Sequence, residues 1–427
     1  MLRKSIAALF ALALCATGAA AAKDLNFDQL DGNVTKAALA SNNLKISVPR
    51  SVPANYRRGR NGSWTIMVYI NGKNNLEKYG LKDLNEMEMV GSNDRVKVVA
   101  ELGRIKGYSA DEGDWTGIRR YLVQKDNNPR AVTSPVVMSM PKADMGDWKH
   151  LVDFVNWAKA NYKSDNYMLV VWNHGAGWVR NRGFRALSKG ISYDDETNNH
   201  ITTPQLGEAL RQMGGVNIYA SDACLMQMAE VDYELKDTTE FIVGSEETEP
   251  GDGWTYDLFL NKLAAEPSLT PRNVAMHAVD AYTEHYVSIG QGATQSAVDS
   301  SLIRNGQFSA LLDAWTDAVV AANVPQAVKD ARAEAQSYAY DDNKSLAHFV
   351  HLVDTKANNA KVTDAGNALI SFIQDKLVIN NKTNKYPESR GLAIYIPNYR
   401  FDETYNALAF AHGSKWAAFA KWAAGLK

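Results

Sequence analysis

Short apolar runs alternate with segments of helical period between residues 64 and 245. This alternation limits the fold more than any other feature, because strands that alternate with helices form a mostly parallel sheet covered by helices on both faces. The predicted fold class is therefore α/β. The pattern predicts strands at 65–70, 96–102, 118–123, 131–138, 167–172, 216–220 and 241–245, and helices at 76–90, at 148–162, from the N-cap Thr203 onward and at 225–230.

The amino-terminal segment has the features of a secretory signal peptide. Arg3 and Lys4 precede a short apolar run, and the alanines at 19–22 offer small-residue cleavage sites. No later stretch reaches the roughly 18 apolar residues that a spanning helix requires. We therefore expect a secreted or periplasmic protein without stable membrane insertion. Leu14 before Cys15 fits a lipoprotein signal poorly, so we do not expect lipidation.

The composition excludes some classes of partner. Hydrophobic residues make up 45% of the chain and charged residues 22%, which is ordinary for a globular protein. Removal of Arg3 and Lys4 leaves 44 basic residues against 48 acidic ones, and this balance argues against nucleic acid as a partner. No Gly-rich phosphate loop follows a predicted strand, so we expect no nucleotide cofactor.

One cysteine lies outside the signal segment. Cys224 follows the predicted strand at 216–220, and His174 follows the strand at 167–172. In an open α/β sheet the carboxyl ends of the strands line the crevice in which ligands bind. An odd cysteine in an exported protein indicates a reactive thiol, and a His about 50 residues before a Cys is the order found in caspases. The pair therefore predicts a thiol protease rather than a buried structural cysteine.

Several motifs follow one another along the chain: WTIMVY at 64–69, NGKNNL at 71–76, WNHG at 172–175, DACLM at 222–226, SEE and GDGW within 245–254, and GLAIYIP at 391–397. Together they resemble the clostripain-like cysteine peptidases, which belong to the caspase–gingipain–legumain fold group. The resemblance spans residues 64 to 397, and the His-Gly and Asp-Ala-Cys turns are its most specific parts. It implies a caspase-like fold and a cysteine endopeptidase.

The chain is accordingly divided into four regions. Residues 1–22 are the signal peptide, and residues 23–62 are an N-terminal extension or pro-segment. Residues 63–300 form the caspase-like peptidase domain. Residues 301–427 form a helix-rich C-terminal region with one late strand at 391–397.

The residue types at the two strand ends suit acyl transfer. Cys224 is the expected nucleophile, and the helix predicted directly after it would favour the thiolate through its N-terminal dipole. His174 is the expected acid–base group. The resemblance implies that the N–H groups of Gly175 and Cys224 form the oxyanion hole.

Two acidic residues lie near the expected nucleophile in the sequence. Asp222 stands two residues before Cys224, and Asp252 lies in a Gly-Asp-Gly-Trp loop after the next strand. The resemblance implies that acidic residues at these places form the base of the first specificity pocket. The enzyme would then cleave protein or peptide substrates after a P1 Arg or Lys. A helix N-cap or turn role for Asp222 and a plain turn role for Asp252 are the alternatives.

A basic segment follows His174. Residues 178–190 show neither helical nor strand period, and such loops are preferred sites of nicking. Each basic side chain there suits the inferred pocket, so we expect a zymogen that cuts itself in this segment, first between Lys189 and Gly190. An ordinary basic surface loop is the alternative. The candidate residues are Arg180, Arg182, Arg185 and Lys189.

No metal site is predicted, because the chain has no His-Glu-x-x-His, Cys-x-x-Cys or EF-hand motif. The acidic runs at 194–196 and 246–247 leave Ca²⁺ open as a cofactor, since some members of the resembled family depend on it. We expect these runs to be solvated acidic loops.

Two other functions remain as alternatives. A secreted binding protein that retains the peptidase fold without activity would use the cleft for recognition only, but the intact Cys–His pair argues against it. A caspase-like enzyme specific for acidic residues would need an Arg in its pocket, and the acidic Asp222 and Asp252 disfavour it.

Overall fold

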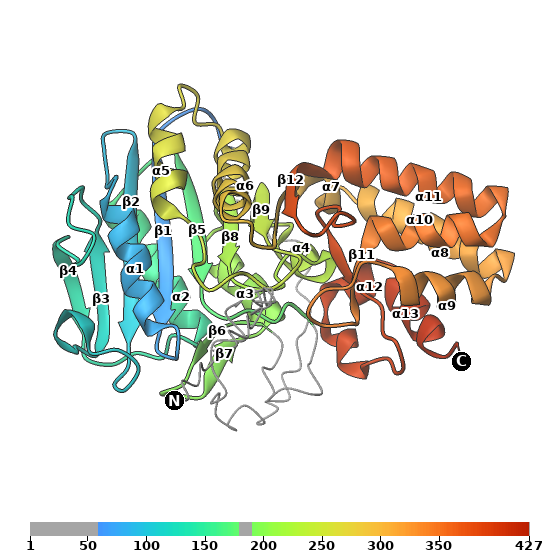
Figure 1. The fold of residues 1–427 in the computed structure, drawn as a ribbon, viewed down its shortest axis with the longest axis horizontal. Helices are drawn as coiled ribbons and strands as arrows, with labels where there is room; N and C mark the ends of the chain where they lie inside the picture. Colours follow the sequence, from blue (N-terminus) through green and yellow to red (C-terminus); the bar gives the residue numbers. More distant parts are fainter. Residues whose placement is uncertain (1–58, 179–189, 427) are drawn as a thin grey trace, which may run out of the picture.

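The computed structural model describes residues 59–178 and 190–426, and its centre is a nine-stranded sheet (Figure 1). The strand order is β12-β10-β9-β8-β5-β1-β2-β3-β4. The strands are β1 (Trp64–Gly72), β2 (Val96–Arg104), β3 (Gly117–Leu122), β4 (Val136–Met140), β5 (Asn166–Trp172), β8 (Ile218–Asp222), β9 (Phe241–Gly244), β10 (Ala293–Asp299) and β12 (Val378–Asn384).

The sheet is parallel in its middle and antiparallel at both margins. Strands β9, β8, β5, β1 and β2 pair in parallel, whereas β3, β4, β10 and β12 join antiparallel. Every residue of β1, β8 and β9 is buried, as expected for parallel strands covered on both faces. This burial explains why their continuous apolar runs could be recognised in the sequence.

Six helices flank the sheet in two groups. Helices α1 (Glu77–Glu88), α5 (Tyr256–Ala265) and α6 (Pro271–Ser288) pack on one another, as do α2 (Trp148–Asn161), α3 (Thr203–Gln212) and α4 (Ala229–Leu235). The right-handed rule for crossovers puts α1 on one face and α2 and α3 on the other, because the chain moves along the sheet in one direction from β1 to β2 and in the opposite direction from β4 to β5 and from β5 to β8. The N-cap of α3 is Thr202, one residue before the predicted Thr203, and it forms a capping box with Gln205.

The C-terminal region gathers beyond the β12 side of the sheet (Figure 1). It contains three strands rather than the one that was predicted, because β12 and the short pair β11 (Asn343–Ser345) and β13 (Ala393–Tyr395) all lie there. Strand β12 is largely polar and β10 carries Thr, Gln and Ser, so neither shows the apolar run that marks the central strands. The helices are α7 (Ser301–Arg304), α8 (Gln307–Ala322), α9 (Pro325–Glu334), α10 (Leu346–Ala357), α11 (Ala360–Phe372), α12 (Ala409–Gly413) and α13 (Trp416–Ala424).

Two buried carboxyl groups attach this region to the sheet. Glu230 on α4 accepts hydrogen bonds from the Tyr395 N–H (3.0 Å) and the Tyr405 hydroxyl (2.8 Å). Glu246, after β9, accepts from the Tyr338 hydroxyl at 2.7 Å and from the N–H of residue 391 at 3.1 Å. The C-terminal region is therefore built into the same core that carries the cysteine.

None of the described helices is long and apolar enough to cross a membrane. The expected signal segment at 1–22 and most of the extension at 23–62 lie outside the described residues.

The buried carboxyl groups predict a loss of stability as the pH rises. Burial raises the pKa values of Glu230 and Glu246 to about 7, above the ordinary value of 4.5. Each group therefore stabilises the fold fully below pH 4.5, and this contribution is lost as the pH rises towards 7. In that window each group lowers the free energy of unfolding by up to about 1.4 kcal/mol per pH unit. Melting temperatures measured between pH 5 and 7.5 should fall.

Glu246→Gln supplies the control for this prediction. The glutamine cannot ionise, so the variant should lose less stability than the wild-type protein between pH 5 and 7.5, whatever its absolute melting temperature. Parallel curves for the two proteins would show that Glu246 is ionised throughout and would contradict the assignment.

Candidate active site

The two turns that carry His174 and Cys224 leave neighbouring strands at the same edge of the sheet. Strands β5 and β8 pair in parallel, with Trp172 opposite Asp222. The Asn173 N–H donates to the Asp222 carbonyl at 3.2 Å, so the pairing continues one residue beyond the strand. A side chain on Gly175 would place its Cβ 2.3 Å from the Cys224 carbonyl oxygen. The backbones of the two turns are therefore in direct contact, and only glycine fits at 175.

The Cys224 thiol is buried and faces the chain that follows β9. Its Sγ accepts a hydrogen bond from the backbone N–H of Glu249 at 3.2 Å. Leu225 has a φ of +63°, a conformation that residues with a Cβ seldom adopt, and its N–H donates to the Glu247 carbonyl at 3.1 Å. The sharp turn after the cysteine is thus held by the segment 247–249.

The helix predicted directly after Cys224 is wrong. Residues 225–228 bond instead to their neighbours: the Gln227 N–H donates to the Ser245 carbonyl, and the Gln227 carbonyl accepts from Ala393. Helix α4 begins only at Ala229, is seven residues long and has Glu230 in its first turn. Its dipole does not act on the thiol, because the dipole effect falls off within one turn. The Glu249 N–H, 3.2 Å from Sγ, can favour the thiolate.

His174 is held by a residue that the sequence analysis missed. Its Nε2 lies 2.7 Å from the side-chain oxygen of Asn75, in the loop that follows β1. An amide oxygen only accepts, so Nε2 donates and Nδ1 of the neutral ring carries the lone pair. Asn75 lies in the NGKNNL motif after β1. Its contact with His174 could not be predicted, because nothing in the sequence showed that β1 lies beside β5.

A buried network fixes the turn around His174. The Asn173 side chain donates to the Asn71 carbonyl at 2.7 Å and accepts from the Tyr193 N–H at 2.6 Å. Tyr193 lies in a hairpin of β6 (Ile191–Asp194) and β7 (Asn199–Ile201), and Ile191 forms a backbone bridge with Gly175. The hairpin therefore supports the backbone of the His174 turn.

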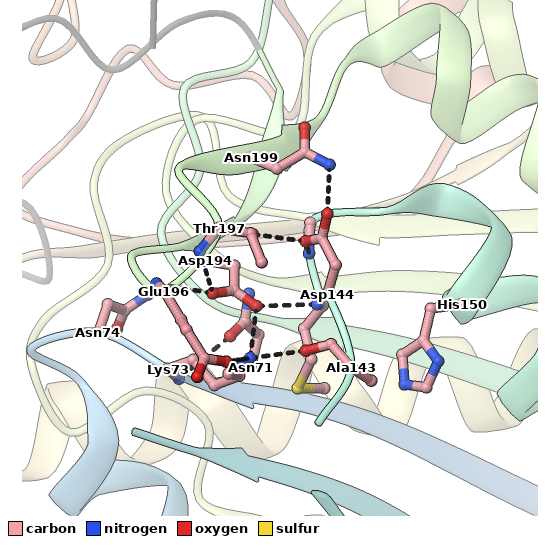
Figure 2. Close-up of polar contacts among 12 residues, drawn as sticks. Asn71, Lys73, Asn74, Ala143, Asp144, His150, Asp194, Glu196, Thr197 and Asn199 are labelled. Carbon is pink, nitrogen blue, oxygen red and sulfur yellow. Dashed lines mark hydrogen bonds and ion pairs between the residues drawn. The ribbon is translucent and has the colours of Figure 1, made fainter. Parts of the chain in front are cut away.

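Lys73 anchors the same hairpin (Figure 2). Its ammonium group is fully buried, donates to the Ala143 carbonyl at 2.6 Å, lies 3.1 Å from Asp194 Oδ2 and pairs with Glu196. Asp144 accepts from Thr197 and Asn199 on the other side of the hairpin turn. A buried cation with two carboxylate partners holds the hairpin firmly, since loss of one partner from such a pair costs about 3–5 kcal/mol.

The two acidic residues predicted for the pocket lie in different environments. Asp222 is fully buried at the end of β8 and accepts from the Tyr256 hydroxyl at 2.8 Å and the Trp254 N–H at 3.2 Å. Burial raises its pKa to about 6. Asp252 is half-exposed and lies 3.3 Å from the Lys82 ammonium. Asp222 is therefore a carboxyl group inside the protein, whereas Asp252 is a carboxyl group at its surface.

Comparison with known proteins assigns the family. The family model described as "Clostripain family" matches residues 68–422, which is most of the chain. The chain belongs to the clostripain family. It is 31% identical to clostripain from Hathewaya histolytica over 288 residues, which cover 62% of this chain and 53% of that protein. The chain thus spans about half the length of this relative.

Two solved structures share the fold of this clostripain-family chain. A secreted C11 cysteine protease from Bacteroides thetaiotaomicron, in complex with an irreversible peptide inhibitor, has a TM-score of 0.60 and 21% identity, and covers 84% of this chain and 99% of its own. An inactive zymogen C11 protease from Parabacteroides distasonis has a TM-score of 0.57 and 17% identity. The match covers 82% of this chain and 97% of that protein. The predicted family and the caspase-like α/β class are confirmed.

The candidate cleavage residues Arg180, Arg182, Arg185 and Lys189 lie outside the described residues. The chain on the far side of this segment is described. The Gly190 carbonyl accepts from the Ala176 N–H at 2.9 Å, which begins the contact between the His174 turn and the β6–β7 hairpin.

Of the two acidic runs that left Ca²⁺ open, 246–247 is buried, whereas in 194–196 Asp194 is buried and Glu196 is exposed. Glu246 and Glu247 are buried, and the carboxylates of Asp194 and Glu196 already pair with Lys73. Across residues 59–178 and 190–426, no three His, Cys, Asp or Glu side chains are grouped so that they could hold a metal ion.

The Asn75 contact predicts a measurable effect on the His174 imidazole. Asn75→Ala should lower kcat/KM by about 10- to 100-fold, because the ring loses the partner that sets its tautomer. Asn75→Asp should retain more activity. It should also move the alkaline limb of the pH–rate profile to higher pH, because a carboxylate stabilises the imidazolium.

Asn161→Ala is the matched control for Asn75→Ala. Asn161 is exposed near the end of α2, where its amide donates to the Trp157 carbonyl. The control should leave both the rate and the profile unchanged. A pH–rate profile that is identical in wild type and Asn75→Asp would reduce Asn75 to a packing role.

Proposed function

We propose that the protein is an exported cysteine endopeptidase that cleaves peptide bonds after Arg or Lys through a dyad of Cys224 and His174. The observation that carries the proposal is the contact between the two turns at the adjacent ends of β5 and β8. Membership of the clostripain family supports the reaction class. The signal-like segment at 1–22 supports export.

The proposed reaction uses these groups in two steps. Nδ1 of His174 takes the proton of the Cys224 thiol, the thiolate attacks the peptide carbonyl carbon, and the developing oxyanion accepts from the N–H groups of Gly175 and Cys224. His174 then donates a proton to the leaving amine, and a thioester remains on the cysteine. In the second step His174 takes a proton from water, whose oxygen attacks the thioester and releases the carboxylic acid. Asn75 keeps the imidazole oriented through both steps.

The charge near the thiol supports basic substrates. Asp222 is the inner carboxyl group, two residues before the nucleophile, and Asp252 adds negative charge farther out. A guanidinium or ammonium group entering beside Cys224 would find an acidic environment. An enzyme for acidic P1 residues would instead need a buried cation there.

Removal of either dyad member should abolish most of the activity. Cys224→Ala and His174→Ala should each lower kcat/KM by about 10³-fold or more, because members of a catalytic unit act together. The measurement is hydrolysis of fluorogenic peptides that differ only at P1, with circular dichroism to show that each variant is folded. Activity near the wild-type level in either folded variant would exclude the dyad. A folded wild type that cleaves no P1 variant would support the binding-protein alternative.

We also propose that the protein matures by cutting itself between residues 178 and 190. The contacts of Gly190 and Ile191 with the His174 turn, and the Lys73 anchor of the hairpin, support this proposal because they would hold the new chain end after cleavage. Purified wild type should convert to two chains that remain associated, with a new amino terminus between Asn181 and Ile191. Cys224→Ala should remain a single chain. Wild type that is fully active and uncut would contradict self-processing.

A further inference from the structure

Four buried polar atoms close to Cys224 have no hydrogen-bond partner. They are both carboxyl oxygens of Glu249, the indole Nε1 of Trp254 and the hydroxyl of Tyr282. All three side chains are at most 1% exposed. Buried polar atoms are almost always hydrogen-bonded, so a group of unpaired ones beside the nucleophile can accept a polar ligand group.

These atoms belong to one place in the molecule. The Glu249 backbone N–H is the donor to Cys224 Sγ, so its side chain starts beside the thiol. The backbone N–H of Trp254 binds Asp222, and the charges of Glu249, Asp222 and Cys224 all act on the Tyr282 hydroxyl. An acceptor carboxyl group and two donors therefore surround one region next to the nucleophile.

The carboxyl groups of Glu249 and Asp222 lie against each other. Each of the two carboxyl groups acts on the pKa of the other, so they lie close together. Burial and the charge of Asp222 raise the pKa of Glu249 well above its ordinary value, so Glu249 holds its proton to a higher pH than an ordinary carboxyl group does. Two adjacent buried carboxyl groups without a cation are unfavourable for the protein and favourable for a cationic ligand.

The other charged and titratable groups around the pair do not supply that cation. Asp83 on α1 is buried and binds the Trp172 indole, and Glu86 pairs with Lys82 at 3.0 Å. Lys82 is partly exposed and is also shared with Asp252. Among residues 59–178 and 190–426, the other groups that act on the pair include the neutral hydroxyl groups of Tyr256 on α5 and of Tyr282 and Tyr286 on α6.

We propose that Glu249 is the residue that determines specificity for the basic P1 side chain, with Asp222 as its partner and with Asp252 in a secondary role. The proposal rests on the proposed function, since it names the group that reads the charge of the substrate. A guanidinium or ammonium group that enters this region donates to the Glu249 and Asp222 carboxylates, and the proton that Glu249 held is released to solvent. Glu249 also donates its backbone N–H to Cys224 Sγ, so the same residue contributes to charge recognition and to alignment of the thiol.

The test compares peptides with Arg and with citrulline at P1, because citrulline has nearly the same shape as Arg and no charge. In wild type kcat/KM should be much higher for Arg. Glu249→Gln should lower kcat/KM for the Arg peptide by about 30-fold or more, as expected for loss of one member of a buried charge pair. The same substitution should change kcat/KM for the citrulline peptide only slightly. The loss should exceed that of Asp252→Asn by about tenfold. Glu334→Gln, an exposed carboxyl group on α9 that pairs with Lys356, is the control for the substitution itself.

The pH dependence gives a second readout. The pKa of Asp222, raised to about 6 by burial, means that the pair gains its negative charge as the pH rises through 6. The preference of wild type for Arg over citrulline should therefore increase between pH 5 and 7, and in Glu249→Gln this increase should be smaller. If Glu249→Gln does not fold, Glu249→Asp takes its place, with an expected loss of Arg preference of at least about fivefold because the shorter carboxylate is withdrawn.

The outcomes separate this inference from the proposed function. A wild type without preference for Arg or Lys overturns the proposed function and this inference with it. A wild type that prefers Arg while Glu249→Gln keeps the same Arg-to-citrulline ratio overturns only the role of Glu249. Equal losses for Arg and citrulline would make Glu249 a structural residue and would also overturn the inference.

Discussion

The site depends on the parallel pairing of β5 with β8. This register places Trp172 opposite Asp222, so the residues that follow the two strands emerge side by side. The backbone of the His174 turn can then touch that of the Cys224 turn because residue 175 is glycine. A shift of the register by one residue would turn the buried side chains of either strand to the opposite face, so the same apolar packing that stabilises the sheet also positions the two reactive groups.

Around this pair the protein uses irregular backbone held by hydrogen bonds from distant segments. The loop 225–228 is bonded on one side to the chain after β9 and on the other to residue 393 in the C-terminal region. Lys73 and Asn173 fix the hairpin behind the His174 turn. The site lowers the stability of the fold, because it includes a residue at positive φ and several buried carboxyl groups. Burial of a large apolar core offsets this loss of free energy.

Much of the fold could be predicted because the central strands are buried on both faces and appear as apolar runs. The His174 and Cys224 turns could be located for the same reason, since each follows such a run. Strands β10 and β12 were missed because their polar side chains find partners in the tertiary structure. The roles of Asn75 and Glu249 could not be predicted, because each depends on which segments lie side by side. The helix after Cys224 was wrong because tertiary hydrogen bonds outweighed its local helical pattern.

Covalent labelling tests the central claim most directly. The mature wild-type protein would be treated with an irreversible peptide inhibitor that carries Arg at P1, then analysed by intact mass and by peptide mapping. The account predicts one adduct per chain, on Cys224, and no adduct when the protein is first unfolded in urea, because the reaction needs the folded site. A folded protein that takes no adduct, or takes it on another residue, would contradict the account.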